Sequence, residues 1–291
     1  MKKNNINISK EYNQFNPQKR MVILNDFACF GRCAITVALP ILSSMGFECC
    51  PIPTSLLSTN GAFLGYRIQD ETAFMKETIS HFQELELPFD GILTGFFTSS
   101  EQIRLTCEFI KTIKKPHTKV IVDPIMGDHG KLYSVTARDI GEAMIPLLQL
   151  ADVITPNLTE AYELVKEPFN PSPSKDEMAH LAKKLQLLGP KGIIITGRKE
   201  GNTFYNDIFD QHGSYSIATT QIGTERCGTG DVFSSVVTGN LISGASLVAS
   251  VEKAVSFLNE TIAYTTKLGI SPKQGVCFEP FLYKLQQLLI E

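Results

Sequence analysis

The feature that most constrains the fold of this chain is a series of short apolar runs, each ending in small or polar residues. Such runs occupy residues 21–24, 49–53, 91–94, 120–123, 153–155 and 193–196. Longer stretches with helical spacing separate them, at residues 34–45, 72–85, 101–115, 137–150 and 175–188. Strands that are apolar on both faces and alternate with helices form a parallel sheet covered on two sides. We therefore expect an α/β three-layer fold with a central, mostly parallel sheet and helices on both faces.

The chain has 291 residues, and we interpret it as one large domain, residues 21–291, preceded by a flexible N-terminal arm, residues 1–20. The arm is rich in Asn, Lys and Gln and has no periodic apolar pattern. The proline-rich residues 168–174 are interpreted as a surface loop. Residues 201–218 carry aromatic and β-branched side chains around Gln211-His212-Gly213, which predicts an antiparallel hairpin at one edge of the sheet.

Composition and charge limit the classes of partner. Hydrophobic residues make up 43% of the chain and charged residues 20%, while the formal net charge is −3. A chain with this charge has no general attraction to nucleic acid or to an anionic membrane, so we expect neither partner. No apolar run approaches the roughly 20 residues that span a bilayer, and a signal-peptide pattern is missing, so we expect a cytoplasmic protein. The seven cysteines are interpreted as reduced thiols, not as a zinc site.

In parallel sheets, ligands bind outside the carboxyl ends of the strands. The predicted strands place polar side chains at that edge: Asp26, Thr94, Asp123, Thr155 and Thr196.

The tetrapeptide Gly228-Thr229-Gly230-Asp231 precedes an apolar helical run, residues 232–241. Glycines allow close approach of the backbone to a ligand, and a helix N-terminus favours an anion. The simpler alternative, in which Asp231 only stabilises the helix start, explains these four residues about as well. A P-loop string does not occur, and Gly31 stands without the other glycines of a dinucleotide fingerprint.

The ordered segments Val122-Asp123-Pro124-Ile125-Met126-Gly127-Asp128, Thr155-Pro156-Asn157-Leu158-Thr159-Glu160-Ala161, Ile195-Thr196-Gly197 and Cys227-Gly228-Thr229-Gly230-Asp231-Val232-Phe233 extend this pattern. With them the chain resembles the ribokinase-like kinases, and among these the vitamin B6 and hydroxymethylpyrimidine kinases. The resemblance covers nearly all of the chain after residue 20. It implies the ribokinase-like three-layer fold and transfer of the γ-phosphoryl group of ATP to a hydroxymethyl group.

The resemblance also implies roles for residues on the phosphate side. Asp231 corresponds to the base that takes the acceptor proton, and the N–H groups of Gly228, Thr229 and Gly230 to the donors that steady the phosphoryl charge. Thr196, Thr224 and Arg226 correspond to nucleotide contacts, with an exposed loop position as the alternative for Arg226.

The same resemblance implies a magnesium site. Asn157 and Glu160 match an Asn-x-x-Glu element that holds Mg²⁺ and phosphate through water, and Asp123 and Asp128 are further acidic candidates. Oxygen ligands and retained waters suit Mg²⁺. Helix capping by Asn157, with Glu160 three residues later, is an alternative of nearly equal strength, and both roles can coexist.

On the acceptor side, Asp26, Thr59, Asn60 and Tyr133 are the candidate substrate-binding residues. Asn60-Gly61 also fits a plain turn. Cys227 directly precedes the anion loop, where a lowered thiol pKa would permit reversible addition to an aldehyde; a packed small thiol is the alternative.

The first-choice function is an ATP- and Mg²⁺-dependent kinase of pyridoxal, pyridoxine and pyridoxamine that yields pyridoxal 5'-phosphate and related products. The alternatives are a hydroxymethylpyrimidine kinase of thiamin synthesis and, from another class, a non-catalytic binding or regulatory protein on the same fold. The resemblance suggests a homodimer and leaves a monovalent-cation requirement open.

Overall fold

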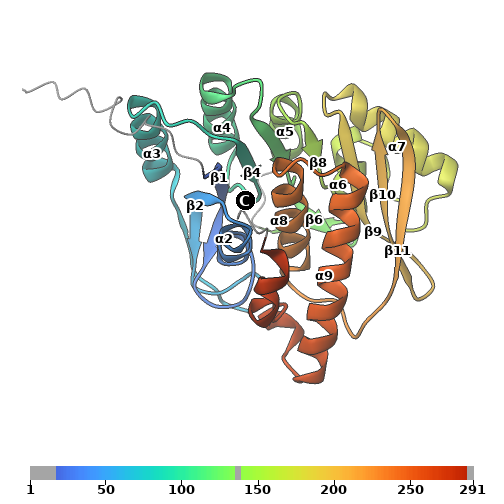
Figure 1. Ribbon diagram of the computed structural model, residues 1–291. Helices are drawn as coiled ribbons and strands as arrows, with labels where there is room; N and C mark the ends of the chain where they lie inside the picture. The colour runs from blue at the N-terminus through green and yellow to red at the C-terminus, as the bar shows by residue number, and fades with distance from the viewer. Residues whose placement is uncertain (1–17, 135–138, 287–291) are drawn as a thin grey trace, which may run out of the picture.

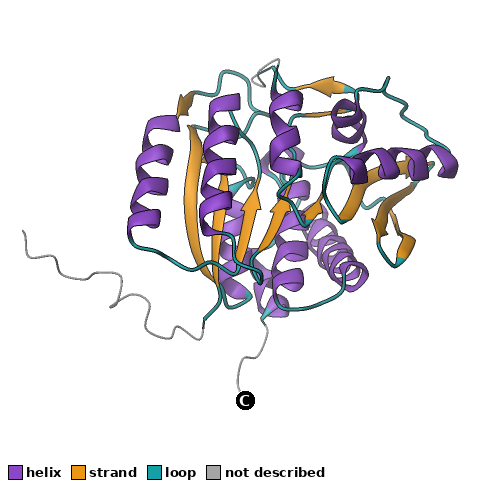
Figure 2. Cartoon of the chain, turned by 90° about the horizontal axis from the view of Figure 1, so that it is seen from above, coloured by secondary structure: helices purple, strands orange, loops and turns teal. Residues whose placement is uncertain are grey.

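A nine-stranded sheet forms the centre of the protein, whose computed structural model describes residues 18–134 and 139–286. The strand order is β11-β10-β9-β8-β5-β4-β1-β2-β3. The six strands from β9 to β2 in that order pair in parallel, and β3, β10 and β11 pair antiparallel at the two edges. Figure 1 shows the sheet with helices along it, and Figure 2 shows it from above between two helical layers. The predicted fold class is confirmed.

The predicted strands match the parallel strands closely. The strands of the sheet are β1 Arg20–Ala28, β2 Glu48–Leu57, β3 Ile68–Asp70, β4 Gly91–Thr94, β5 Lys119–Val122, β8 Val153–Ile154, β9 Gly192–Glu200, β10 Thr203–Asp210 and β11 Gly213–Thr220. The predicted edge hairpin is confirmed as β10 and β11. A separate two-stranded hairpin, β6 Gly127–Asp128 and β7 Lys131–Leu132, was not predicted.

Two hydrophobic cores explain why the parallel strands are apolar on both faces. In β1, Val22 and Leu24 face one core, while Met21 and Ile23 face the other. The first core is covered by α3 Thr72–Glu84, α4 Ser100–Ile113, α5 Ile140–Leu148, α6 Leu158–Val165 and α7 Lys175–Leu187. The second is covered by α2 Ile35–Ser44, α8 Thr229–Ile242, α9 Leu247–Lys267 and the 3-10 segment η2 Glu279–Leu285. A short 3-10 turn, η1 Pro272–Gln274, precedes η2.

The ends of several predicted elements differ from the structure. Strand β1 begins at Arg20, because that residue pairs with Glu48 of β2 and its side chain binds the Glu48 carboxylate at 2.8 Å. Residues 1–17 of the predicted arm lie outside the described residues, as do residues 137 and 138 of the predicted helix 137–150. The proline-rich residues 168–174 form a loop, as predicted.

Helix α9 is the longest element without a sequence prediction. Ser246 caps its first turn by accepting the N–H of Ala249 at 3.2 Å. Its buried residues Leu247, Val251 and Ala254 recur at helical spacing, so the signal was present in the sequence.

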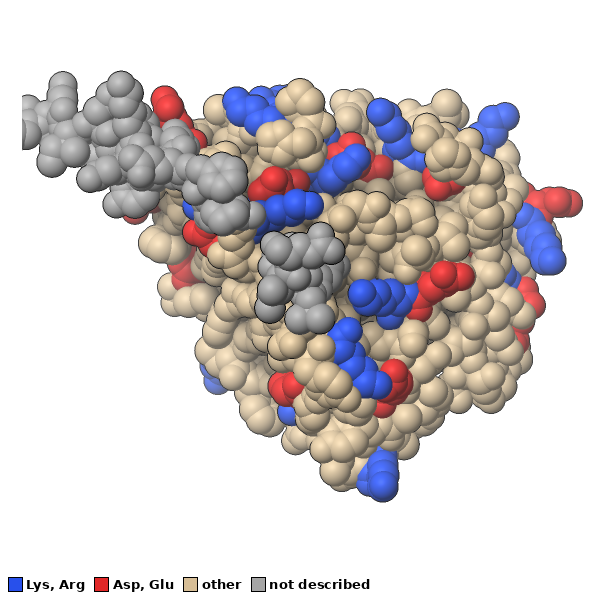
Figure 3. Space-filling view, in the orientation of Figure 1, with Lys and Arg blue, Asp and Glu red and all other residues tan. Residues whose placement is uncertain are grey.

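Within the part of the chain that is described, the helices are all too short or too polar to cross a bilayer. On the face seen in Figure 3, basic and acidic side chains are interspersed and do not gather into a field of one sign.

Candidate active site

The carboxyl ends of the parallel strands bring several acidic side chains together. Asp26 lies in β1 and Asp123 directly follows β5, while Asp231 lies in the first turn of α8. The charge of Asp231 raises the pKa of both other carboxyls, so the three groups are close. The sequence-based expectation that polar side chains gather at this edge of the sheet is therefore met by these carboxyls, while the ligand site itself stays a prediction.

Asp231 is held by two donors. The backbone N–H of Ala34 bonds its carboxylate, and Nδ2 of Asn25 lies 3.4 Å from Oδ1. Burial raises the pKa of Asp231 to about 6, against the opposing effect of both hydrogen bonds. Asp231 is therefore largely a carboxylate at neutral pH but retains some basicity, which suits a group that accepts a proton.

At neutral pH the carboxyls of Asp26 and Asp123 are ionised to a smaller extent than that of Asp231. Burial, and then the charge of Asp231, raise the pKa of Asp26 to about 7 and that of Asp123 to about 8. Among the described residues, no lysine or arginine contributes to either shift. The cluster is thus an uncompensated acidic site, which attracts a cation.

The loop before α8 approaches the β1–α2 connection very closely. Gly228 has a φ of +73°, and a Cβ atom there would lie 1.9 Å from the carbonyl oxygen of Arg32. Only glycine fits this position. The Thr229 hydroxyl donates to the Arg226 carbonyl at 2.9 Å, while a Cβ at Gly230 would meet nothing within 4 Å. The side of the loop at Gly230 is thus open for a ligand.

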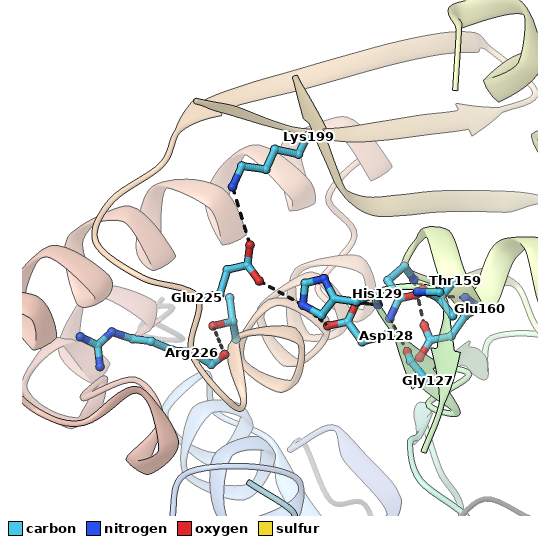
Figure 4. Close-up of polar contacts among 11 residues, drawn as sticks. Gly127, Asp128, His129, Thr159, Glu160, Lys199, Glu225 and Arg226 are labelled. Carbon is cyan, nitrogen blue, oxygen red and sulfur yellow. Dashed lines mark hydrogen bonds and ion pairs between the residues drawn. The ribbon is translucent and has the colours of Figure 1, made fainter. Parts of the chain in front are cut away.

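Asn157 and Glu160 form a complete capping box at the start of α6. The Asn157 side chain accepts the N–H of Glu160 at 3.0 Å, and Glu160 accepts the N–H of Asn157 at 2.8 Å. Glu160 also accepts the N–H of Met126 at 3.2 Å, and Asn157 donates to the Gly127 carbonyl at 2.8 Å. The predicted capping role is confirmed. It also ties α6 to the β6–β7 hairpin, as Figure 4 shows.

The metal expectation is compatible with this donor set. Burial and then the charge of Asp123 raise the pKa of Glu160 well above its usual value. Among the described residues, no three His, Cys, Asp or Glu side chains form a ready ligand group. Mg²⁺ commonly uses one or two carboxylates, with waters and substrate phosphates completing its shell. Asp123 and Glu160 fit that pattern, while Asp128 is exposed and lies beside His129.

The predicted nucleotide contacts occupy different settings. Thr196 forms an isolated parallel bridge with Asn157, which places it beside the capping box. Thr224 is exposed in the loop before α8. Arg226 donates to the Ile270 carbonyl at 2.8 Å, and Figure 4 shows its side chain directed away from Glu160. In this structure its positive charge lies at the end of α9.

The loop residues on the acceptor side have local partners. Asn60 is buried and donates to the Lys273 carbonyl at 2.8 Å, while its own side-chain oxygen accepts the N–H of Ala62 at 3.0 Å. The latter is the turn geometry given as the alternative. Its neighbour Thr59 bonds only weakly within the same turn, at 3.3 Å.

Tyr133 follows β7, on the hairpin that α6 holds. Partial burial, and then the charges of Glu160 and Asp128, raise its pKa, although 43% of the residue remains exposed. Tyr133 therefore lies at the surface near the capping box.

Cys227 packs against the cluster that contains a second cysteine, Cys33. The Cys33 thiol lowers the pKa of the Cys227 thiol and the Gly228 N–H adds to the effect, while burial opposes both. The expected lowered pKa is therefore present, but Cys33 contributes more to it than the helix N-terminus does.

Sequence reasoning assigned no role to Asn25 or to the N–H of Ala34. Asn25 precedes Asp26 at a predicted strand end, which is the signal that could have identified it. The contact of Ala34 with Asp231 carries no sequence signal, because any residue supplies a backbone N–H.

Comparisons with known proteins agree with this arrangement. The family model described as "Phosphomethylpyrimidine kinase" matches residues 39–276. A solved structure of a candidate phosphomethylpyrimidine kinase from Bacteroides thetaiotaomicron, in an orthorhombic form with pyridoxal, superposes with a TM-score of 0.89. It is 33% identical, covering 92% of this chain and 96% of that one.

Two curated relatives carry different names. A hydroxymethylpyrimidine/phosphomethylpyrimidine kinase of Aquifex aeolicus is 25% identical over 63% of this chain and 71% of its own length. A pyridoxine kinase of Bacillus subtilis is 31% identical over 60% of this chain and 64% of its own length. The chain thus spans about two thirds of the length of these two curated relatives.

Proposed function

The chain belongs to the phosphomethylpyrimidine kinase family and is a kinase of the ribokinase-like type, and within that family we propose that it phosphorylates the 5'-hydroxymethyl group of vitamin B6 vitamers with ATP. The observation that carries the proposal is the position of Asp231. It lies in the first turn of α8, three residues after Gly228, where a phosphoryl group would bind, and close enough to Asp26 to raise the pKa of that carboxyl. A base between an anion site and an acceptor site is what transfer to a hydroxyl requires.

In the proposed reaction, Asp231 accepts the proton of the acceptor hydroxyl as its oxygen attacks the γ-phosphorus of ATP. The N–H groups of Thr229 and Gly230, together with the start of α8, stabilise the charge on the transferred group. Asn25 and the Ala34 N–H hold the Asp231 carboxylate in place. Thr196 and Thr224 are proposed as nucleotide contacts.

Asp123 and Glu160 would hold Mg²⁺ through water, which supplies the positive charge that this acidic cluster lacks when the nucleotide is bound. We propose that Mg²⁺ held by this pair is what would allow the acidic site to accept the negatively charged ATP. Asp128, at the exposed end of the hairpin, would act at longer range.

Cys227 favours the vitamers over the pyrimidine. Its lowered thiol pKa makes the thiolate available, and a thiolate adds reversibly to the aldehyde of pyridoxal. Pyridoxal in the similar Bacteroides structure supports this choice. Asp26 would pair with the polar edge of the ring, with Tyr133 closing the other side.

Phosphorylation of hydroxymethylpyrimidine is the second candidate, supported by the matching family model and by the Aquifex relative. The intact Asp231, Gly228 and Glu160 argue against the non-catalytic alternative. The homodimer and the cytoplasmic location stay predictions, while the monovalent-cation requirement stays open.

Steady-state ATP consumption with pyridoxal, pyridoxine, pyridoxamine, hydroxymethylpyrimidine and ribose tests the proposal, with and without Mg²⁺. We expect the highest kcat/KM with a B6 vitamer and no turnover without Mg²⁺. A higher kcat/KM for hydroxymethylpyrimidine would transfer the proposal to the thiamin precursor. Cys227→Ala should reduce the activity with pyridoxal more than that with pyridoxine, which has no aldehyde; an equal loss would contradict covalent capture.

A further inference from the structure

Two cysteines from distant parts of the chain meet beside the catalytic base. Cys33 lies in the β1–α2 connection and Cys227 in the loop before α8, and Cys227 packs against the small cluster that contains Cys33. Both pack in one small cluster with Ala28, Ala34 and Leu57. They are free thiols in this structure.

The backbone geometry brings the two segments within reach of a covalent link. A Cβ atom on Gly228, the residue after Cys227, would lie 3.3 Å from the Cα atom of Cys33. Disulfide formation needs Cα atoms about 4.4–6.8 Å apart and side chains that face each other. The close approach of the two backbones and the packing of both cysteines in one cluster place the chain near these conditions.

We propose that Cys33 and Cys227 form a reversible disulfide that switches the kinase off under oxidising conditions, with a peroxide as the oxidant. Each cysteine is next in sequence to a group that the reaction uses. Cys33 precedes Ala34, whose N–H holds Asp231, and Cys227 precedes the Gly228 loop. A bond between the two sulfurs would therefore displace both Asp231 and the Gly228 loop.

The chemistry balances with hydrogen peroxide. The Cys227 thiolate attacks one peroxide oxygen, the O–O bond breaks, and hydroxide leaves and takes a proton to become water. The Cys33 thiol then attacks the sulfur of the Cys227 sulfenic acid, the S–O bond breaks, and a second water leaves. Two thiols lose two electrons and two protons, and one peroxide is reduced to two waters.

The two thiols suit these roles. Cys227 is only half-buried and has the lowered pKa of an attacking thiolate, while Cys33 is buried and has a raised pKa. Cys107 provides a matched comparison, because it is a buried thiol inside α4 whose pKa is raised by burial.

The experiment treats the full chain with hydrogen peroxide, blocks free thiols, and maps disulfides in the unreduced digest by mass spectrometry. We expect a cross-linked peptide pair that joins Cys33 to Cys227, loss of at least about 90% of kinase activity, and recovery with dithiothreitol. With pyridoxine as the acceptor, Cys33→Ala should retain its activity before oxidation. Under excess peroxide it should lose most of the reversibility, because its Cys227 sulfenic acid lacks the Cys33 thiol and is oxidised on to the sulfinic acid. Cys107→Ala should behave like the unaltered chain.

A different pairing, such as Cys29 with Cys227 or a link between two chains, would overturn the proposal. So would a Cys33→Ala variant that is inactivated and restored as the unaltered chain is. Peptide mapping of the unaltered chain decides the pairing even if that variant fails to fold. The switch relies on the proposed function only for its activity readout: a reduced enzyme inactive with every acceptor would refute the proposed function and leave the mapped disulfide standing.

Discussion

The side-chain amide of Asn25, in β1, donates to the catalytic candidate Asp231, 206 positions later in the chain, over 3.4 Å. The oxygen of the same amide accepts two backbone N–H groups, those of Asp26 at 2.9 Å and Phe96 at 2.8 Å. The oxygen of the Asn25 amide is therefore held by two backbone donors, while its nitrogen donates to Asp231. We interpret Asn25 as a positioning residue for the base.

Asn25→Ala should lower kcat about tenfold, equivalent to about 1.4 kcal/mol, because Asp231 loses one donor. The hydrogen bond favours the charged carboxylate, so its loss also raises the pKa of Asp231. Activity depends on the carboxylate and rises with pH through about 6; this limb should move to higher pH in the variant. The pH dependence of kcat/KM measures it.

Asn240→Ala is the matched control, because Asn240 is a buried asparagine of α8 whose side chain donates to the Val236 carbonyl at 2.8 Å. It should lower the melting temperature without moving the acidic limb. An unmoved limb in Asn25→Ala would contradict the positioning role.

The buried carboxyls make the ligand-free protein less stable as the pH rises. The folded-state pKa of Asp123, about 8, lies above its unfolded value near 3.8. The folded state therefore binds more protons between these values, so the contribution of Asp123 is fully present below pH 4 and is lost as pH rises through 8. Asp123→Asn should raise the melting temperature at pH 8 by about 2 °C or more and have less effect at pH 5.

The same substitution should reduce Mg²⁺-dependent turnover, since it removes a proposed metal ligand. Differential scanning calorimetry of the ligand-free variant at both pH values tests the stability effect separately from activity. A variant less stable than the unaltered chain at pH 8 would show that the hydrogen bonds of Ser234 and Thr155 to the Asp123 carboxylate outweigh the cost of burying its charge.

A comparison of variants at Glu160 and Glu177 distinguishes a helix-capping role from a metal-binding role. Both accept the N–H of their N-cap residue in a capping box, Glu160 at α6 and Glu177 at α7. Because glutamine can take the same place in a capping box, Glu160→Gln and Glu177→Gln should both keep the helix cap. Only Glu160→Gln should raise the Mg²⁺ concentration for half-maximal activity, by about tenfold. Equal, small effects on Mg²⁺ dependence would leave Glu160 with the capping role alone.

Gly228 and Gly230 differ in what a methyl group would meet. At Gly228 the positive φ and the Arg32 carbonyl both oppose a side chain, so Gly228→Ala should destabilise the protein by at least about 1–3 kcal/mol. Gly230→Ala has open space and should fold with a nearly unchanged melting temperature. Thermal unfolding of both variants compares them, and equal losses would contradict the close approach of the two loops.

The sequence predicts the sheet well because its strands are buried on both faces and are therefore recognisable as short apolar runs. It predicts the capping box because Asn157 and Glu160 are local neighbours. Contacts such as Asn25 with Asp231 or Cys33 with Cys227 join segments about 200 residues apart, and single-sequence periodicity carries no information on them. The direction of the Arg226 side chain depends on where α9 ends, so its sequence position alone did not reveal it.

The most direct test of the account is the single-turnover rate of phosphoryl transfer in Asp231→Asn, measured with saturating ATP and Mg²⁺ and the preferred acceptor. We predict a rate lower by about 10²–10⁴-fold with the dissociation constant for ATP nearly unchanged, as expected for loss of a general base. A variant that transfers phosphoryl at close to the unaltered rate would contradict the assignment of Asp231.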